Sequence, residues 1–237
     1  MIGTQEPAMC PTAWEDLTGV LFAAVSHDMR GPLTSIKAAA TSLLWTEVDW
    51  DAGMARELAT LINEQADQLD HLLESLLDLS RIEAGMLKAA RQPVYIDEVV
   101  AKAIYTLTLS EAQVVVDIPV QMEAITADEG LLERAIANVV ANGVSWSPQE
   151  SPVRVETALL RATVEIRVID RGPGIPEDQR ESVFLPFSRL TRPSGSPPGL
   201  GLGLAVAREF VRAVGGDLTV EDTPGGGATF IFRFSRC

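Results

Sequence analysis

The chain has 237 residues, 46% hydrophobic and 22% charged, a composition typical of a folded protein rather than a disordered one. Its 33 acidic and 19 basic residues give a net charge of −14, which argues against nucleic acid or an anionic membrane surface as a main partner. With only Cys10 and Cys237, no apolar run long enough to span a bilayer and no secretory signal, we expect a chain without a disulfide framework or transmembrane segment. We expect it in the cytoplasm, either by itself or as the cytoplasmic part of a membrane-anchored protein.

The first part of the chain predicts two long helices, the first beginning near Thr12–Trp14. Apolar residues within 22–43 and 58–79 recur at alternating spacings of three and four, which indicates a heptad seam and left-handed supercoiled packing. The connector VDWDAG makes the pair an antiparallel hairpin. Leu73 and Leu77 widen the second apolar stripe beyond a two-helix contact. We therefore expect a homodimer in which two hairpins form a four-helix bundle.

Pro32 lies inside the first predicted helix, where proline removes one backbone hydrogen bond and costs about 3 kcal/mol. Two interpretations are open. The helix continues through Pro32 with a kink, or it begins after Pro32. The first is favoured because the apolar seam continues in phase on both sides of the proline.

His27 is the candidate nucleophile of this hairpin. It is two residues from both Val25 and Met29 of the seam, so it is turned about 200° from each and should face outward. Asp28 can orient the imidazole through Nδ1 and leave Nε2 to attack. The alternative is a solvated surface histidine without a role, an interpretation that describes His71.

Beyond residue 90 the pattern changes to the short β-rich runs, glycine turns and helical stretches of an α/β domain. Strands are predicted at 114–118, at 153–160 and 163–169 as a hairpin, and at 217–222 and 228–234 around the turn TPGGG. One helix is predicted from an N-cap at Asp128 through Asn142, and another within 201–216, ended by glycine.

Polar residues in this second part fit a nucleotide pocket. Asp170 continues the apolar row of its strand at period two, so it should be buried and accept a hydrogen bond from a group such as a purine amine. Alternatively, the strand has already left the core there and Asp170 starts the turn. Asn138 and Asn142 share a helix face, and their amide oxygens suit Mg²⁺. The alternative for these two is a polar surface.

Glycines supply the remaining features of this pocket. Gly172 and Gly174 allow close approach of the backbone to a ligand. Gly199, Gly201 and Gly203 open a helix whose free amides and dipole suit phosphate, although a tight packing joint would also explain them. The segment is neither a Walker A loop nor a dinucleotide fingerprint.

In chain order, these segments resemble the sequence boxes of the two-component sensor histidine kinases. SHDMRGPLTSI is similar to the phosphoacceptor box, ERAIANVVANGVSWSP to the asparagine box, and DRGPGIP and GLGLGLAVAREFV to the two glycine boxes. VFLPF is similar to the phenylalanine box and GGGATFIFRF to the closing strand. The resemblance runs from about residue 20 to the end of the chain. IKAAATSLLWTEVDW is further similar to the Kdp-type potassium and osmotic sensor kinases.

The resemblance implies an α+β chain with three parts. After a tail at 1–12, residues 13–88 would form the dimerisation and phosphoacceptor bundle. Residues 89–237 would form an α/β-sandwich ATP-binding domain of the histidine kinase, Hsp90 and gyrase type. ATP bound with Mg²⁺ would donate a phosphoryl group to His27, and this group would pass to an aspartate of a response regulator receiver domain. A linker at 84–92 would act as a hinge.

The resemblance also implies roles for individual residues. Asp28 would assist His27, Asn142 with Asn138 beside it would hold Mg²⁺, and Asp170 would bind the adenine amine. The remaining nucleotide contacts would be made by Trp146, Gly172, Gly174, Ile175, Arg189, Arg192, Gly199, Leu200, Gly201, Leu202, Gly203, Leu204 and Thr229.

Three positions depart from the family pattern. Ser145 replaces a basic residue, which would weaken phosphate binding or turnover. Gly143 replaces an alanine and weakens its helix slightly. Gly31 replaces the Thr or Asn that is linked to phosphatase action, so weak phosphatase activity is expected. Two alternatives stay open: a catalytically weak or inactive dimeric nucleotide-binding scaffold, and an ATP-hydrolysing relative of the Hsp90 or gyrase type.

Overall fold

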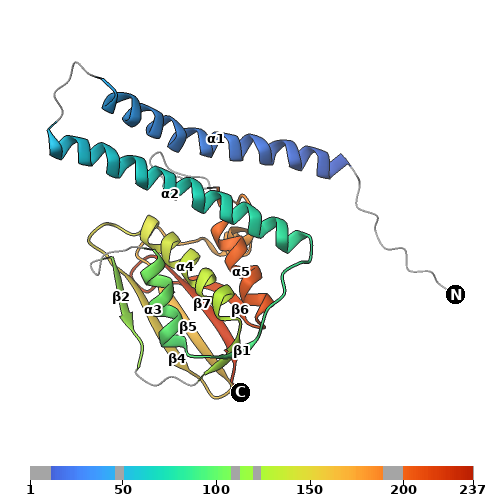
Figure 1. Ribbon diagram of the computed structural model, residues 1–237. Coiled ribbons are helices and arrows are strands. Elements are labelled where there is room, and N and C mark those ends of the chain that lie inside the picture. Colours follow the sequence, from blue (N-terminus) through green and yellow to red (C-terminus); the bar gives the residue numbers. More distant parts are fainter. Residues whose placement is uncertain (1–11, 46–50, 108–112, 120–123, 189–199, 237) are drawn as a thin grey trace. The chain divides into compact units, whose positions relative to one another are not determined.

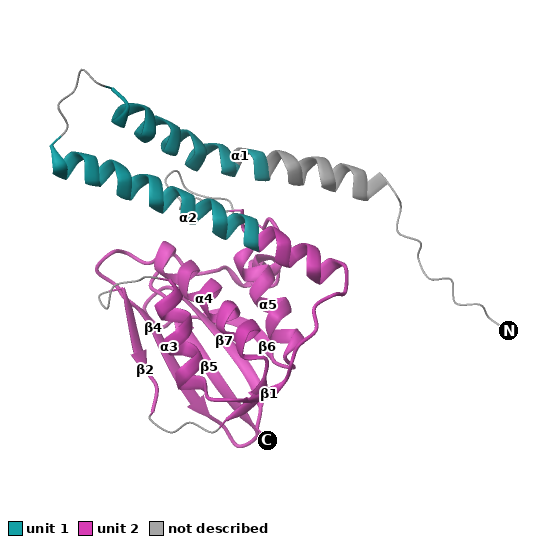
Figure 2. Ribbon diagram, viewed as in Figure 1, with its two compact units in different colours: residues 1–74 teal, residues 75–237 magenta. Residues whose placement is uncertain are grey.

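The structure is a computed structural model that describes residues 12–45, 51–107, 113–119, 124–188 and 200–236. The chain divides into two compact units, Met1–Glu74 and Ser75–Cys237 (Figure 2). Within the described residues, no helix combines the length and apolar character that a membrane span requires.

The first unit consists of two long helices, α1 at Thr12–Leu43 and α2, which begins at Ala52 and ends at Glu83 in the second unit (Figure 1). Both predicted helices are confirmed. Pro32 lies inside α1, so the interpretation that this helix begins after the proline is wrong. The seam positions of the two helices from Met29 onward are buried or half-buried, whereas Leu73 and Leu77 are about half exposed, at 48% and 49%.

Among its described residues, the second unit contains a five-stranded mixed sheet, a two-stranded sheet, the end of α2 and three further α-helices. The large sheet has the order β2-β4-β5-β7-β6, in which β2 and β4 are parallel and the other neighbours antiparallel. Its strands are β2 at Val114–Asp117, β4 at Val153–Leu159, β5 at Thr163–Ile169, β6 at Asp217–Asp222 and β7 at Ala228–Ser235. The small sheet pairs β1 at Gln92–Val94 with β3 at Ile125–Ala127.

Three helices cover one face of the large sheet (Figure 1). They are α3 at Ile96–Thr106, α4 at Glu129–Trp146 and α5 at Gly203–Ala213, and two 3₁₀ turns, η1 at Glu177–Gln179 and η2 at Ser182–Phe184, precede α5. The core lies between these helices and the sheet, where Ile166 of β5 and Phe230 and Phe232 of β7 are fully buried. Burial in β7 extends to both faces of the strand, since Ile231 between the two phenylalanines is only 1% exposed.

The predicted strands and helices of the second unit are confirmed, with shifted ends. The helix predicted through Asn142 continues for one more turn, to Trp146, and the helix expected within 201–216 occupies Gly203–Ala213. Asp128 caps α4 as predicted, because its side chain accepts a hydrogen bond from the Leu131 N–H at 3.1 Å. Strands β1 and β3 and helix α3 were not predicted from the sequence.

Candidate functional site

The candidate phosphoacceptor lies in the middle of α1. His27 is part of this helix, but its side chain lies outside the described residues. The neighbouring Asp28 is half-buried. One turn further on, a Cβ atom added to Gly31 would have no heavy atom within 4 Å, so a larger side chain fits there.

In the second unit, Asp170 follows the last residue of β5 and is only 4% exposed. The alternative that the strand has left the core at this residue is therefore wrong. Its backbone N–H still donates to the Ala228 carbonyl of β7, at 2.9 Å, so the ladder between the two strands continues through it. The sequence prediction of a buried carboxylate at the end of an apolar row is confirmed.

The Asp170 carboxylate is held by two backbone donors. The N–H groups of Gly172 and Ala228 both donate to Oδ1, at 2.9 and 2.8 Å. Burial raises the pKa of Asp170 above its ordinary value of 3.8, and these two hydrogen bonds oppose the shift only in part. Since both bonds end on Oδ1, the Oδ2 atom is the one that can accept a hydrogen bond from a ligand.

Helix α4 brings the asparagines close to this carboxylate. Asn138 and Asn142 are half-buried and one turn apart. Gly143 packs directly under Asp170, because a Cβ atom on it would lie 3.5 Å from the Asp170 Cβ and 3.1 Å from a methyl group of Val153. This tight contact with Val153 gives a physical reason for glycine at a position where the resemblance leads us to expect alanine.

The end of α4 also contacts the first glycine segment. A Cβ atom on Gly172 would lie 3.1 Å from the Trp146 Cβ and 3.2 Å from the Trp146 carbonyl oxygen. Next to it, the Arg171 N–H donates to the Ser147 hydroxyl at 3.1 Å. The backbone and Cβ of the half-buried Trp146 therefore lie beside the segment that was predicted to shape the adenine pocket.

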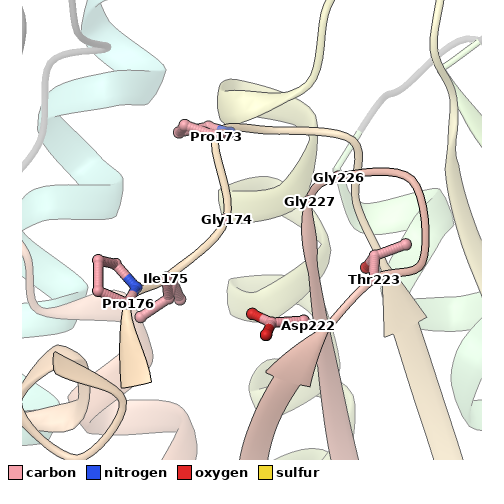
Figure 3. Close-up of a pocket in the computed structure, with 8 residues that line it drawn as sticks. All are labelled: Pro173, Gly174, Ile175, Pro176, Asp222, Thr223, Gly226 and Gly227. Atoms are coloured by element: carbon pink, nitrogen blue, oxygen red, sulfur yellow. The ribbon is translucent and has the colours of Figure 1, made fainter. Parts of the chain in front are cut away.

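The first glycine segment and the β6–β7 turn together line a pocket of about 370 Å³ (Figure 3). Gly174 has a positive φ of 77°, and its Cβ position would lie 3.3 Å from the Gly227 carbonyl oxygen, so the two segments touch through their backbones. The lining consists of Pro173, Gly174, Ile175, Pro176, Asp222, Thr223, Gly226 and Gly227.

Thr229 is placed differently from the other predicted nucleotide residues. Its hydroxyl lies 2.9 Å from the hydroxyl of Thr223, and both side chains are buried. On β7 it follows Ala228, the residue that bonds to Asp170, so the alternation of the strand turns Thr229 toward the other face of the sheet. The structure therefore brings Thr229 to the β6–β7 turn rather than to the Asp170 carboxylate.

The second glycine segment ends at the start of α5, next to α4. A Cβ atom on Gly203 would lie 3.9 Å from the Asn138 Cβ. Gly201 has φ 69°, and a side chain there would come within 2.7 Å of the Ser188 carbonyl oxygen. Leu200 and Leu202 are buried and Leu204 packs against the core, so the three leucines fix this segment to the domain. The glycines between them have no side chain that would cover the backbone amide groups.

Within the part of the chain that the structure describes, the N-terminus of α5 has no side-chain cap, since its N-cap residue is Leu202. Its first amide groups are therefore available to a ligand, and the helix dipole favours an anion at this end. Asn138 lies beside Gly203, so one of the two predicted Mg²⁺ ligands is next to this anion site. Arg189, Arg192 and Gly199, which were predicted to contact phosphate, lie outside the described residues.

Ser145 lies one turn after Asn142, on the exposed side of α4. Its hydroxyl donates to the Ala141 carbonyl within the same helix, at 2.8 Å. Ser145 therefore supplies neither a positive charge nor an outward-directed donor. Among the described residues, no group of three or more His, Cys, Asp or Glu side chains gathers to hold a metal ion.

Two family models match the chain. The model described as "His Kinase A (phospho-acceptor) domain" matches residues 19–85, and "Histidine kinase-, DNA gyrase B-, and HSP90-like ATPase" matches residues 127–236. His27 lies within the first match, and Asn138, Asn142 and Asp170 lie within the second.

Curated relatives include the sensor protein KdpD of Mycobacterium tuberculosis (strain ATCC 25618 / H37Rv), 38% identical over 92% of this chain and 26% of the relative. KdpD of Escherichia coli (strain K12) is 29% identical over 97% of this chain and 26% of the relative. The chain thus spans about a quarter of the length of these relatives.

Solved structures show the same fold. Full-length ShkA in complex with AMPPNP has a TM-score of 0.62 at 25% identity, covering 91% of this chain and 46% of that one. Histidine kinase ThkA in complex with response regulator protein TrrA has a TM-score of 0.66 at 18% identity, covering 95% and 64%. With a phosphoacceptor hairpin followed by an ATPase domain, the chain belongs to the sensor histidine kinases.

Proposed function

We propose that this chain uses Mg-ATP to phosphorylate His27 and passes the phosphoryl group to an aspartate of a response regulator. The observation that carries the proposal is the convergence of three features in the second unit. The buried Asp170, the asparagine face of α4 and the open N-terminus of α5 meet through Gly143 and Gly203, and the chain also contains a helical hairpin whose sequence carries His27 and Asp28.

The chemistry assigned to His27 is an in-line displacement. The Nε2 lone pair attacks the γ-phosphorus, the Nε2–P bond forms, and the bond between that phosphorus and the β,γ-bridging oxygen breaks to release ADP. Asp28 would hold the imidazole through Nδ1–H and stabilise the positive charge that develops on the ring. The phosphorylated ring then donates the group to the regulator's aspartate.

ATP would lie between α4 and the two glycine segments. Asp170 Oδ2 would accept a hydrogen bond from the adenine amine, with Trp146, Gly172, Gly174 and Ile175 around the base. The α5 N-terminus would bind phosphate through the backbone of residues 199–204, with Arg189 and Arg192. Asn142 and Asn138 would hold Mg²⁺ through amide oxygens, together with water and phosphate oxygens, as this hard ion prefers.

The first test is incubation with Mg-ATP labelled at the γ-phosphate, beside the variant His27→Gln. We expect acid-labile, base-stable label on the wild type alone, and nucleotide binding by both proteins. Label on both would place the phosphoryl group on another residue. Absence of label from both proteins, with ATP still bound, would favour the alternative of an inactive dimeric scaffold. The reason to consider this alternative is Ser145, which is uncharged and whose hydroxyl is hydrogen-bonded to the Ala141 carbonyl of its own helix.

A further inference from the structure

Arg171 joins three segments that meet beside Asp170. Its backbone N–H donates to the hydroxyl of Ser147, directly after α4, at 3.1 Å. Its guanidinium Nη1 donates to the Pro224 carbonyl at 2.7 Å and lies 3.4 Å from the Gly226 carbonyl oxygen, both in the β6–β7 turn. Since Arg171 itself belongs to the first glycine segment, one residue connects that segment to the end of α4 and to the β6–β7 turn.

The tip of the β6–β7 turn has few other contacts. Gly225, Gly226 and Gly227 have positive φ angles of 88°, 106° and 107°, and glycine loses more conformational freedom on ordering than any other residue. Within the turn, Thr223 is hydrogen-bonded to Gly226 and Gly227. Among the described residues outside the turn, only Arg171 Nη1 lies within 4 Å of a Cβ atom added to Gly225, and no heavy atom lies that near to one added to Gly226. The Arg171 guanidinium therefore holds the tip in place.

The same turn leads into one of the two donors to the Asp170 carboxylate. A Cβ atom on Gly227 would collide with the Asp170 carbonyl oxygen, so the end of the turn packs directly on the backbone of this residue. The next residue, Ala228, donates to Oδ1 at 2.8 Å, and Gly172, which follows Arg171, donates to the same atom at 2.9 Å. Because the two donors come from the two segments that Arg171 joins, the position of the turn on the glycine segment determines the direction of Oδ2.

The charge of Arg171 acts on the same carboxylate. Burial raises the pKa of Asp170, and the backbone hydrogen bonds from Ala228 and Gly172 lower it, as does the positive charge of Arg171. An ionised carboxylate has only acceptor positions, and this is the form that an amine donor requires. Arg171 therefore favours the form of Asp170 that can bind an adenine amine.

We propose that Arg171 is a positioning residue for the adenine amine, an inference that rests on the proposed function. Its guanidinium holds the β6–β7 turn against the first glycine segment, so both donors stay on Oδ1 and Oδ2 stays directed toward the amine. The turn also forms one wall of the pocket in Figure 3, through Gly226 and Gly227. Loss of the guanidinium weakens the hydrogen bond to the amine and leaves the phosphate and Mg²⁺ contacts unchanged.

The test compares two nucleotides that differ only in this amine, ATP and the triphosphate of purine riboside, whose base has hydrogen in place of the 6-amino group. Their dissociation constants are measured by calorimetry with Mg²⁺. The wild type should bind ATP about tenfold more tightly or more, and Arg171→Met less than about threefold, with an unchanged affinity for the purine riboside triphosphate. A ratio as high in Arg171→Met as in the wild type, whether or not both affinities fall, would overturn the positioning role.

Two further variants separate this role from a general loss of structure. Arg171→Lys should give an intermediate ratio, since its ammonium group keeps the charge and can donate to one carbonyl. Arg91→Met is the matched control, because Arg91 is also an exposed arginine that donates to a distant backbone carbonyl, that of Ala213 at 3.1 Å. This bond lies at the C-terminal end of α5, so its removal should leave the ratio of the two dissociation constants at the wild-type value.

A second readout needs no nucleotide. Hydrogen exchange of the Gly172 and Ala228 N–H groups, resolved by NMR, should be about threefold faster or more in Arg171→Met than in the wild type, and unchanged in Arg91→Met. Unchanged exchange at both groups in Arg171→Met would also overturn the proposal. A wild type that binds the two nucleotides equally would instead contradict the adenine acceptor of the proposed function, and the exchange result would still decide whether Arg171 holds the two donors.

Discussion

Asp170 is the residue whose proposed hydrogen bond to adenine is expected to lower the stability of the fold. Because burial raises its pKa, the ionised side chain is destabilised in the folded chain relative to the unfolded chain at neutral pH. In Asp170→Asn the amide oxygen can keep both backbone hydrogen bonds, but Nδ2 replaces the acceptor Oδ2. We expect unchanged or higher stability to denaturant at pH 7, and an affinity for ATP lower by about tenfold or more in calorimetry.

The matched control for this substitution is Asp217→Asn. Asp217 is exposed at the start of β6 and does not line the pocket formed by the first glycine segment and the β6–β7 turn. The Asp217→Asn variant should bind ATP like the wild type. Equal affinity in Asp170→Asn and the wild type would contradict the role of Oδ2 as the adenine acceptor.

Ser145 is one of the three positions at which the chain departs from the family pattern. Replacing it with lysine places an ammonium group one turn from Asn142, where it can approach the phosphates. Ser145→Lys should lower the KM for ATP in the phosphorylation assay by about threefold at low salt, and the effect should shrink as salt is added. An effect that is absent at every ionic strength would show that position 145 does not face the phosphates.

At the scale of elements, the glycine segment before α5 depends on backbone geometry that other residues resist. Gly201 has a positive φ, and a Cβ atom there would collide with the Ser188 carbonyl oxygen. Gly201→Ala should therefore cost about 1–3 kcal/mol of unfolding free energy and weaken ATP binding by displacing the start of α5. Chemical denaturation and calorimetry measure the two effects.

Gly31→Ala is the control for this backbone argument. Gly31 lies inside α1 with helical geometry and open space around its Cβ position. Alanine should stabilise that helix by up to about 1 kcal/mol. If both substitutions had the same effect on stability, the strain assigned to Gly201 would be wrong.

The sequence predicted the elements with a long, regular pattern. The heptad seam identified α1 and α2, and apolar residues at period two identified the buried face of β5. The three-residue strands β1 and β3 are too short to show a period, and they are stabilised by pairing with each other across the chain. Helix α3 had a usable signal, since Ile96, Val99, Val100 and Ala103 share one face and are all buried.

The candidate site was predicted where local pattern determines the geometry. The burial of Asp170 followed from the period of its strand, and the shared face of Asn138 and Asn142 from the period of their helix. The contacts of Arg171 with the β6–β7 turn could not be predicted, because they join residues 53 and 55 positions apart through packing that no local pattern records. The direction of Thr229 followed from the register of β7 with β5, which the sequence did not define.

At the scale of the whole molecule, the uncovered face of the sheet carries a pH-sensitive ion network. Glu165 of β5 is 2% exposed and accepts hydrogen bonds from Arg167 and Arg233. Burial alone would raise the pKa of Glu165, but these arginines outweigh it and the net pKa lies below 4.5. Because the folded pKa lies below the unfolded one, this stabilisation is fully present above pH 4.5 and is lost as the pH falls through the folded value.

Glu165→Gln tests this network. It should lower the unfolding free energy by about 1–3 kcal/mol at pH 7, and the difference from the wild type should shrink below about pH 4.5. Urea denaturation of both proteins between pH 7 and values below about pH 4.5 measures this difference in unfolding free energy. A difference that stays constant with pH would mean that the carboxylate contributes through shape rather than through charge.

Assembly is the remaining property at this scale. Leu73 and Leu77 are half exposed on α2 although they extend its apolar stripe, and a hairpin that leaves such a stripe open gains by pairing with a second copy. We therefore expect a dimer at micromolar concentration in sedimentation velocity, and a monomer when both leucines are changed to glutamate, since four buried carboxylates would face one another without partners. Leu159→Glu, equally exposed at the end of β4, should remain dimeric. A wild type that sediments only as a monomer would exclude the four-helix bundle.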